Sequence, residues 1–282
     1  MVTISNSEIT LVVSKKGAEI QNIICGGTEY MWSRDEKFWA QSAPIMFPMC
    51  GGLKGGRYEL DGVSYEMPKH GFAKLSEFEV EKQTENSVTF VLYDNEQTRK
   101  MYPFAFAFRV SYELEGKSIK VTYDAENRDN KTMYCTFGAH EAYACPEGIE
   151  AYELIFSEKE TLYAYGLNGD IVTDYTKLVL SGSDRLALDD KHFVLDALVF
   201  RGVKSNSVTL ASKVSDRRVR VAFEGFDYLV LWHKHTAPYI CIEPWCGLPD
   251  VVGSGYNFAE KEGMHALAVG GHFARTHTIT VG

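Results

Sequence analysis

Apolar and polar residues alternate along much of the chain. Ile119, Val121 and Tyr123 are separated by polar residues, and the same period of two recurs at 88–92 and 106–112. Successive side chains of a strand point to opposite faces, so this pattern is typical of half-buried β-strands. Further strands are expected at 207–211, 219–223, 228–232, 239–243 and 276–281.

Turn signals separate these apolar stretches at short intervals. Asp61-Gly62 and Asn168-Gly169 are dipeptides that favour tight hairpins, because both residues tolerate a positive φ. A single short helical turn is expected at 95–102, where a proline follows. Short strands at this spacing, with almost no helical periodicity, predict an all-β, mostly antiparallel sandwich or barrel.

The charge balance of the chain is acidic. Its 282 residues contain 38 Asp+Glu and 29 Lys+Arg, which gives a formal net charge of −9. Nucleic-acid binding depends on clustered Lys and Arg, whereas the basic residues at 217–220 alternate with valine as on a solvated strand face. We therefore expect no nucleic-acid partner. No internal repeat or low-complexity linker divides the sequence, and we expect a single domain, residues 1–282.

Cysteine usage and apolar stretches bear on the compartment. The six cysteines are scattered without a Cys-x-x-Cys pair, which fits neither a zinc cluster nor a secreted disulfide framework. The first residues lack the basic stretch and apolar run of a signal peptide. No window approaches the roughly 18 uncharged apolar residues of a membrane span. These features predict a reduced, cytoplasmic protein with no membrane partner.

Four segments fit neither a strand pattern nor an ordinary turn. They are 44–56, 68–74, 136–143 and 239–247. In the last of them, Glu243 follows an apolar run and precedes Pro244, which we expect to end strand pairing. Beside Trp245 the carboxyl would be partly desolvated, which raises its pKa and suits it to base chemistry. A surface Glu at the mouth of a loop is the alternative interpretation.

Two histidines lie in the other segments. His70 and His140 each adjoin Gly or Ala, which leaves room for a ligand beside the imidazole. Each alone is consistent with a structural histidine, but together with Glu243 they match an acid/base set for a polar substrate. The candidate faces for a sugar ring are Trp245, Phe72, Tyr143 and Trp32. Aromatic side chains are also common core residues, so a core position is the alternative for these four.

Neither a metal site nor a nucleotide site is predicted. His233 and His235 form a His-x-His pair, which on a strand would place both side chains on one face. A metal site needs a third ligand, which no spacing supplies. The glycine-rich stretch 51–56 lacks the Gly-x-x-x-x-Gly-Lys-Ser/Thr order of a phosphate-binding loop. Its glycines are expected to allow turns beside a pocket, with Lys54 as an anion contact.

Taken together, the four segments resemble the aldose 1-epimerase (galactose mutarotase) family, in particular its LacX-like branch. The matching motifs are Pro-Ile-Met-Phe-Pro, Lys-His-Gly-Phe-Ala-Lys, Gly-Ala-His-Glu-Ala-Tyr and Cys-Ile-Glu-Pro-Trp-Cys-Gly, in that order. The resemblance extends from about Ile4 to the C-terminus. It implies a galactose mutarotase-like β-supersandwich with an open cleft across one sheet. It also implies a small carbohydrate, an aldohexose or a derivative, as the ligand.

The resemblance assigns a role to each matching residue. Glu243 resembles the general base of the family, His140 its general acid, and His70 the histidine that positions and polarises the sugar. Asp196, in an Asp-Ala-Leu-Val-Phe element, resembles a residue that holds substrate hydroxyls, although a turn Asp is an equal alternative. Mutarotation by such a set needs no metal and no cofactor, because two proton transfers open and close the sugar ring.

The sequence departs from the branch at three positions. Gly52 stands where an arginine is usual, Glu141 replaces the proline after the catalytic histidine, and Lys74 replaces an arginine. A lysine is a point charge and does not reproduce the bidentate fork of an arginine. The carboxylate of Glu141 is expected to raise the pKa of the adjacent His140.

These departures leave three functions open. The first is a mutarotase for a hexose, acting as a monomer or homodimer. The second is a carbohydrate-binding or sensing protein on the same fold without turnover, suggested by Gly52. The third is a mutarotase for sugar phosphates, in which Lys54 and Lys74 would contact the phosphate.

Overall fold

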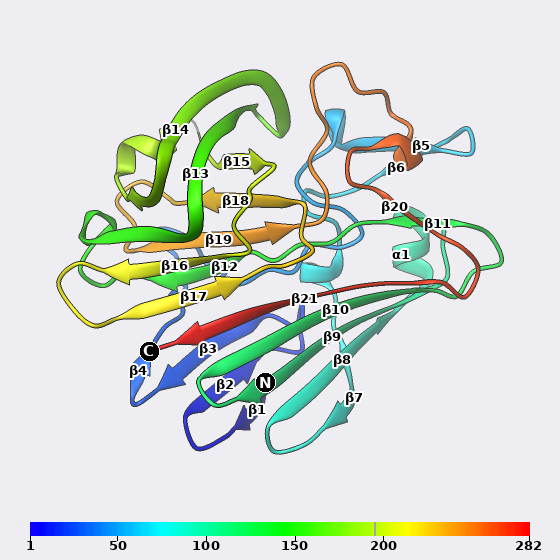
Figure 1. Cartoon of the computed structure of the whole chain (residues 1–282). Helices are drawn as coiled ribbons and strands as arrows, with labels where there is room; N and C mark the ends of the chain where they lie inside the picture. Colours follow the sequence, from blue (N-terminus) through cyan, green and yellow to red (C-terminus); the bar gives the residue numbers. More distant parts are fainter. Residues whose placement is uncertain (195) are drawn as a thin grey trace.

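Strands dominate the structure (Figure 1), a computed structural model that describes residues 1–194 and 196–282. A four-stranded antiparallel sheet is formed by β1 (Val2–Ser5), β2 (Ile9–Val13), β3 (Ile20–Cys25) and β4 (Thr28–Glu29). A 13-stranded sheet has the order β12 (Glu141–Ala144), β19 (Tyr239–Trp245), β18 (Tyr228–Trp232), β15 (Leu198–Arg201), β13 (Tyr152–Asn168), β16 (Ser207–Ser212), β17 (Arg218–Ala222), β21 (His272–Val281), β10 (Ser118–Asn127), β9 (Phe106–Glu115), β8 (Ser87–Tyr93) and β7 (Glu79–Gln83). The remaining strand, β14 (Ile171–Ala187), pairs with β13 outside this order.

Short elements complete the fold. Two further antiparallel pairs are β5 (Arg57–Leu60) with β6 (Val63–Glu66), and β11 (Met133–Cys135) with β20 (His265–Leu267). The helices are α1 (Glu96–Met101) and the 3₁₀ turns η1 (Lys54–Gly56), η2 (Ala73–Leu75), η3 (Ile149–Ala151), η4 (Asp190–Phe193) and η5 (Phe258–Glu260). No helix in the described part of the chain is long and apolar enough to cross a membrane.

The alternating pattern of the sequence is confirmed in the central strands. Along β10, the side chains of Ile119, Val121, Tyr123 and Ala125 are buried, and the polar residues between them are partly exposed. The strands expected near 207–211, 219–223, 228–232, 239–243 and 276–281 are β16 to β19 and the end of β21. The predicted all-β, antiparallel architecture is therefore the observed one.

Two of the predicted turns differ in detail. Asp61 and Gly62 are the central residues of the β5–β6 hairpin and both have a positive φ, 52° and 77°. In the β13–β14 hairpin, Asn168 pairs with Ile171, so the central residues are 169 and 170 instead of the predicted 168 and 169. This shift of one residue places an aspartate at the tip of the hairpin.

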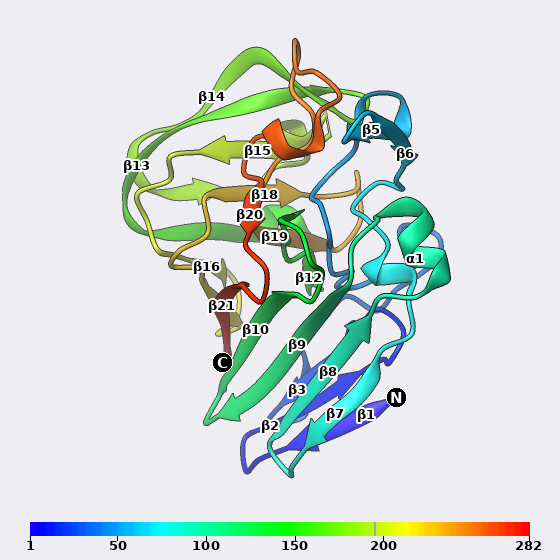
Figure 2. The same cartoon turned by 90° about the vertical axis from the view of Figure 1, so that its right-hand side faces the viewer.

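A two-layer core supports one half of the molecule. Figure 2 shows the small sheet lying against β7 to β9 of the large sheet. Across the interface, Tyr112 of β9 donates a hydrogen bond to the carbonyl of Ala18, 2.6 Å away. Phe47 stacks on Phe108 of β9 with ring centroids 4.1 Å apart. Aromatic packing of this kind fixes the loop 44–52 against the sheet.

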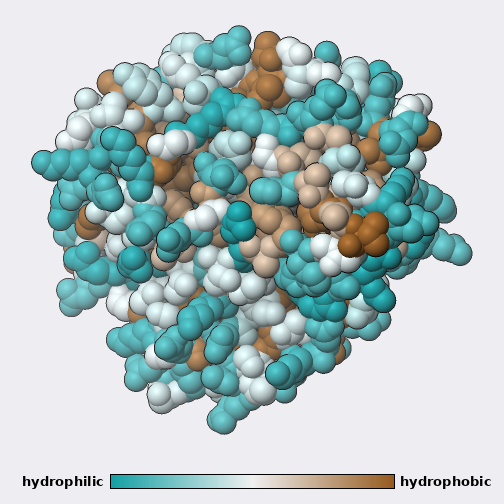
Figure 3. Space-filling model, turned by 45° about the vertical axis from the view of Figure 1, so that its right-hand side comes forward, coloured by the Kyte–Doolittle hydropathy of each residue, from teal (hydrophilic) through white to brown (hydrophobic). Residues whose placement is uncertain are grey.

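The other half of the molecule presents a recess. In Figure 1, β13 and β14 rise on one side of β15, β18 and β19, and the β5–β6 hairpin and a loop near residue 255 rise on the other. The face in Figure 3 is largely hydrophilic, with apolar side chains in separate small patches. Residues from all four segments that the sequence analysis singled out line the recess above β18 and β19.

Candidate active site

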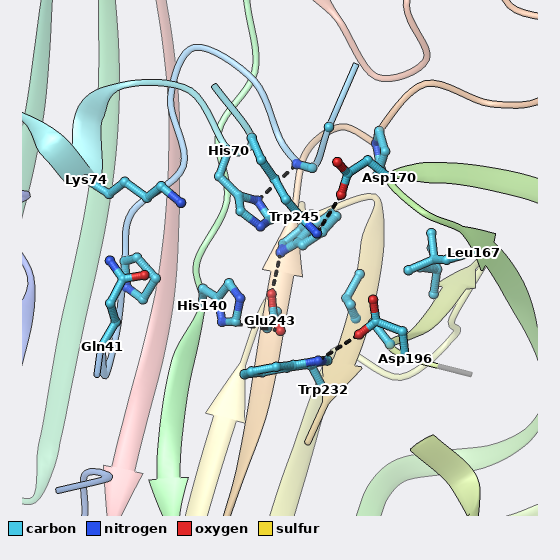
Figure 4. A pocket seen from close by; sticks show the side chains of 18 of the residues that line it. Gln41, His70, Lys74, His140, Leu167, Asp170, Asp196, Trp232, Glu243 and Trp245 are labelled. Atoms are coloured by element: carbon cyan, nitrogen blue, oxygen red, sulfur yellow. Dashed lines mark hydrogen bonds and ion pairs between the residues drawn. The ribbon is translucent and has the colours of Figure 1, made fainter. Parts of the chain in front are cut away.

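The recess contains a pocket of about 310 Å³. Residues far apart in the sequence form its walls, and Figure 4 shows ten of them labelled. The lining residues include Trp39, Gln41, Gly52, Lys69, His70, Lys74, His140, Leu167, Asp170, Asp196, Trp232, Glu243 and Trp245. Six residues proposed from the sequence therefore meet in one pocket.

Glu243 lies in the middle of the pocket floor, on β19. Its side chain is 1% exposed, so the alternative of a surface Glu is wrong. Pro244 does not end the strand, because its carbonyl still accepts a hydrogen bond from Ala139 N and it pairs in register with Leu229 of β18. A proline removes one donor only, and here the ladder continues to Trp245.

The environment of Glu243 favours its protonated form. Burial raises the pKa of this carboxyl well above its usual value, and the negative charges of Glu141 and Asp196 act in the same direction. The indole Nε1 of Trp245 donates to Oε2 at 3.1 Å and opposes the shift. The result is a carboxylate that binds a proton more tightly than an exposed one, as the sequence analysis predicted.

His140 lies beside Glu243 and immediately before β12. Its Nδ1 atom is 3.4 Å from Oε1 of Glu243. The indole of Trp39 stacks on the imidazole at 5.1 Å between centroids, and Trp232 meets it edge-on at 5.7 Å. Burial, followed by the positive charge of Lys74, lowers the pKa of His140 to about 3, so the imidazole is neutral at pH 7.

The expected influence of Glu141 on His140 is wrong. Side chains alternate along β12, so Glu141 points away from the pocket and its Oε1 is 3.0 Å from the Nε2 of buried His277. The pKa of His140 is lowered instead of raised, because desolvation and the two lysines of the pocket dominate. Glu141 influences the site through the pKa of Glu243.

His70 is fixed in one neutral tautomer. The backbone N–H of Gly51 donates to its Nδ1 at 3.1 Å, so the proton of the ring is on Nε2. Burial, His140 and the nearby lysines lower the pKa of His70 well below its usual value. The residue has a φ of 68°, and a Cβ on the following Gly71 would lie 2.1 Å from the carbonyl oxygen of Phe47. His70 is thus a rigidly held hydrogen-bond donor.

Asp196 also has an unusual backbone conformation. Its φ is 81°, and its Oδ1 accepts a hydrogen bond from the indole Nε1 of Trp232 at 2.8 Å (Figure 4). A non-glycine residue at positive φ persists only where surrounding contacts hold it. Here the contact directs the carboxylate into the pocket. Its neighbour in the motif, Leu195, lies outside the described residues.

Four residues proposed from the sequence lie outside the pocket. Trp32 is 4% exposed and packs against Tyr239, with ring centroids 4.7 Å apart. The amine of Lys54 is 5.4 Å from the ring of Tyr256, and its backbone N–H donates to Asp250. Phe72 is 2% exposed and packs in the aromatic core. Tyr143 is fully buried, because it lies two residues after Glu141 on β12 and shares its inward direction.

The histidine pair at 233 and 235 is also different from the prediction. Strand β18 ends at Trp232, so the two side chains do not share a strand face. His233 is buried and contacts Asp190, whereas His235 is exposed with its Nδ1 3.1 Å from the other carboxylate oxygen of Asp190. Through these contacts with Asp190, the two histidines hold the β18–β19 turn against η4.

Among the described residues, one trio resembles a metal-ligand set. The ligand atoms of His140, Cys241 and Glu243 lie within 4.8 Å of one another. Burial raises the pKa of the Cys241 thiol well above its usual value, and a metal-binding cysteine must be deprotonated. The absence of a metal from the proposed chemistry stays a prediction.

Several lining residues were not found by sequence reasoning. Lys69 lies in the Lys-His-Gly-Phe-Ala-Lys motif directly before His70, but the motif alone assigns it no role. Trp39, Gln41 and Trp232 come from segments without a motif, and Leu167 and Asp170 come from the β13–β14 hairpin. Only the fold brings these residues to the pocket.

Burial of Glu243 predicts a pH-dependent cost to stability. We expect Glu243→Gln to raise the free energy of unfolding by about 1–3 kcal/mol at pH 7, because an amide avoids the cost of desolvating a carboxylate. A carboxyl with a raised folded-state pKa loses stability as pH rises above its unfolded value of about 4.3. The gain should therefore vanish below that pH in urea titrations. An equal gain at both pH values would contradict a raised pKa.

A family model and two known sequences match this chain over most of its length. The family model described as aldose 1-epimerase matches residues 1–270. The plasmid-encoded and chromosomal LacX proteins of Lactococcus lactis subsp. lactis are 34% and 33% identical over 280 residues, covering 92% of this chain and 92% of each relative.

Solved structures agree with this result. A galactose mutarotase related enzyme from Lactobacillus acidophilus has a TM-score of 0.95 at 32% identity, covering 100% of this chain and 97% of that one. A galactose mutarotase-like protein from Lactobacillus casei ATCC 334 has a TM-score of 0.95 at 28% identity, with both chains fully covered. The predicted galactose mutarotase-like β-supersandwich is thereby confirmed.

Proposed function

Because the chain belongs to the aldose 1-epimerase family, we propose that it interconverts the α and β anomers of an uncharged aldohexose by acid/base catalysis. The observation that carries the proposal is the pairing of Glu243 with His140 at 3.4 Å on the floor of an open pocket. Ring opening requires one group to take a proton from the C1 hydroxyl and another to give a proton to the ring oxygen.

The pair supplies both transfers. A proton shared by the pair is held by Glu243 in preference to His140, because the pKa of the carboxyl is raised and the pKa of the imidazole is lowered. Transfer of that proton to His140 produces a carboxylate and an imidazolium. Glu243 then takes the C1 hydroxyl proton, His140 protonates the ring oxygen, and the bond between C1 and this oxygen breaks. Rotation about the C1–C2 bond and closure from the other face invert the anomer and return both protons.

Neighbouring groups position the sugar. The Nε2–H of His70 is a fixed donor to a sugar oxygen, since its Nδ1 is occupied by Gly51. Asp196 is an acceptor for hydroxyls, and the indoles of Trp232 and Trp245 supply apolar faces at the pocket wall. A pocket with fixed donors, acceptors and aromatic faces suits a polyhydroxylated ring.

A sugar-binding protein without turnover uses the same pocket and is distinguished by kinetics. We expect His140→Asn to lower enzyme-dependent mutarotation of freshly dissolved α-glucose and α-galactose by about 10²–10⁴-fold, as followed by polarimetry, because the ring-oxygen donor is lost. Lys54→Ala, outside the pocket, should leave the rate unchanged. Rotation at the buffer rate with native protein, together with saturable sugar binding, would establish the binding function instead.

A further inference from the structure

An aspartate occupies the space where the family resemblance leads us to expect an arginine. A Cβ added to Gly52 would lie 2.4 Å from the Cβ of Asp170, so no side chain fits at position 52 while Asp170 is in place. Asp170 is a central residue of the β13–β14 hairpin, 118 positions along the chain. The glycine at position 52 therefore leaves room for an acidic group at the pocket wall.

The backbone fixes this arrangement. Val172 donates to the carbonyl of Asp250 at 2.9 Å, and Asp250 donates to the carbonyl of Gly52 at 3.0 Å. The N–H of Val252 returns a hydrogen bond to Val172, also at 2.9 Å. These bonds tie the tip of the hairpin to both neighbouring loops, so Asp170 is placed by main-chain contacts and not by a flexible loop alone.

Asp170 forms an ion pair across the pocket wall. Its Oδ1 is 2.8 Å from the Nζ of Lys69, and the contact is a dashed line in Figure 4. Both side chains are 48% exposed, so ligand and solvent reach them. Lys69 directly precedes the catalytic His70, and its positive charge is balanced by a carboxylate from the tip of the β13–β14 hairpin.

The charges that line the pocket do not favour an anionic ligand. Lys69 and Lys74 are opposed by Asp170 and Asp196, and Glu243 adds a carboxyl group that holds its proton tightly. An incoming phosphate or carboxylate would have to displace Asp170 from Lys69 or lie beside that carboxylate, and like charges at such distances repel. A sugar hydroxyl, in contrast, can accept from Lys69 and donate to Asp170 at once.

We propose that Asp170 is a specificity-determining residue that reserves the pocket for uncharged aldoses by neutralising Lys69 and repelling anionic sugars. This inference rests on the proposed function for its substrate class. The quantity that it predicts is the ratio of the binding affinities for a neutral sugar and for its 6-phosphate. The Gly52–Asp170 pair acts as a unit, because the glycine makes room for the aspartate.

Asp170→Asn tests the inference, because it keeps the shape of the side chain and removes its charge. We expect binding of glucose 6-phosphate to strengthen by at least about tenfold and binding of glucose to change by less than about threefold. The gain should shrink as salt is raised from low to high ionic strength, since it is electrostatic. Asp174→Asn, an exposed aspartate farther along β14, is the matched control and should leave both affinities unchanged.

Calorimetric or NMR titration with glucose and glucose 6-phosphate measures the ratio directly. Native protein that binds the 6-phosphate as tightly as glucose would overturn the inference, and so would an unchanged ratio in Asp170→Asn. Because the readout is binding, its outcome is separate from the proposed catalysis. A protein that binds glucose without exchanging its anomers would refute the proposed function and still decide the role of Asp170.

Discussion

Glu243→Gln is expected to lower anomer exchange by at least about 10²–10⁴-fold, the usual contribution of a positioned proton-transfer group. Glutamine has the size of glutamate, and its oxygen can still accept the hydrogen bond from Trp245 Nε1. The variant cannot take the C1 hydroxyl proton, nor can it supply the proton that charges His140. Both halves of the reaction therefore fail while the pocket keeps its shape.

Sugar binding separates this loss from misfolding. Glu243→Gln should bind glucose or galactose with an affinity near that of the native protein, since the substitution keeps the size of the side chain and the other lining residues are unchanged. A matched control is Glu262→Gln, which alters a carboxylate paired with Arg201 outside the pocket lining. Retention of native exchange rates in Glu243→Gln would remove Glu243 from the mechanism.

Asp250→Ala is expected to cost about 3–5 kcal/mol of unfolding free energy, the typical effect of removing one partner of a buried ion pair. The side chain of Asp250 is fully buried, contacts the amine of Lys261 through Oδ1 and accepts from the Lys54 backbone through Oδ2 at 2.8 Å. Lys261 is itself only 5% exposed, so the alanine variant leaves a buried cation without its carboxylate.

Urea or thermal unfolding measures this cost. Glu115→Ala is the control, because Glu115 pairs with Lys120 at the surface and surface pairs contribute little. A double variant, Asp250→Leu with Lys261→Met, should recover much of the loss by replacing the pair with apolar contacts. Equal stability of Asp250→Ala and the native protein would show that this pair does not anchor the 250–252 loop. The hairpin tip that carries Asp170 depends on the same loop.

The sequence predicted the parts of the fold in which local chemistry decides the outcome. Alternation identified β10, because its buried positions follow a strict period of two. Asp61-Gly62 predicted a hairpin, since the turn needs two positive φ values. Strand β14 shows no such regularity. Its middle residues are exposed in a continuous run, because there the strand pairs with β13 outside the main order of the sheet and covers no core.

Residues of the site could be predicted from the sequence where they lie in a short motif and their side chains also point into the pocket. Glu243, His140 and His70 lie in short motifs and point into the pocket. Tyr143 lies in the same motif as His140 but faces inward, since strand alternation decides which side it takes. Asp170 lies in no motif, and its contact with Gly52 exists only after the hairpin has folded over the pocket.

The interconversion of the α and β anomers at equilibrium tests the proposed catalysis most directly. It can be followed by selective-inversion NMR of the anomeric proton signals of glucose and galactose. Native protein at micromolar concentration should transfer magnetisation between the α and β signals far faster than buffer, in proportion to protein concentration. Exchange at the buffer rate for both sugars, under conditions where the protein binds them, would contradict acid/base catalysis by Glu243 and His140.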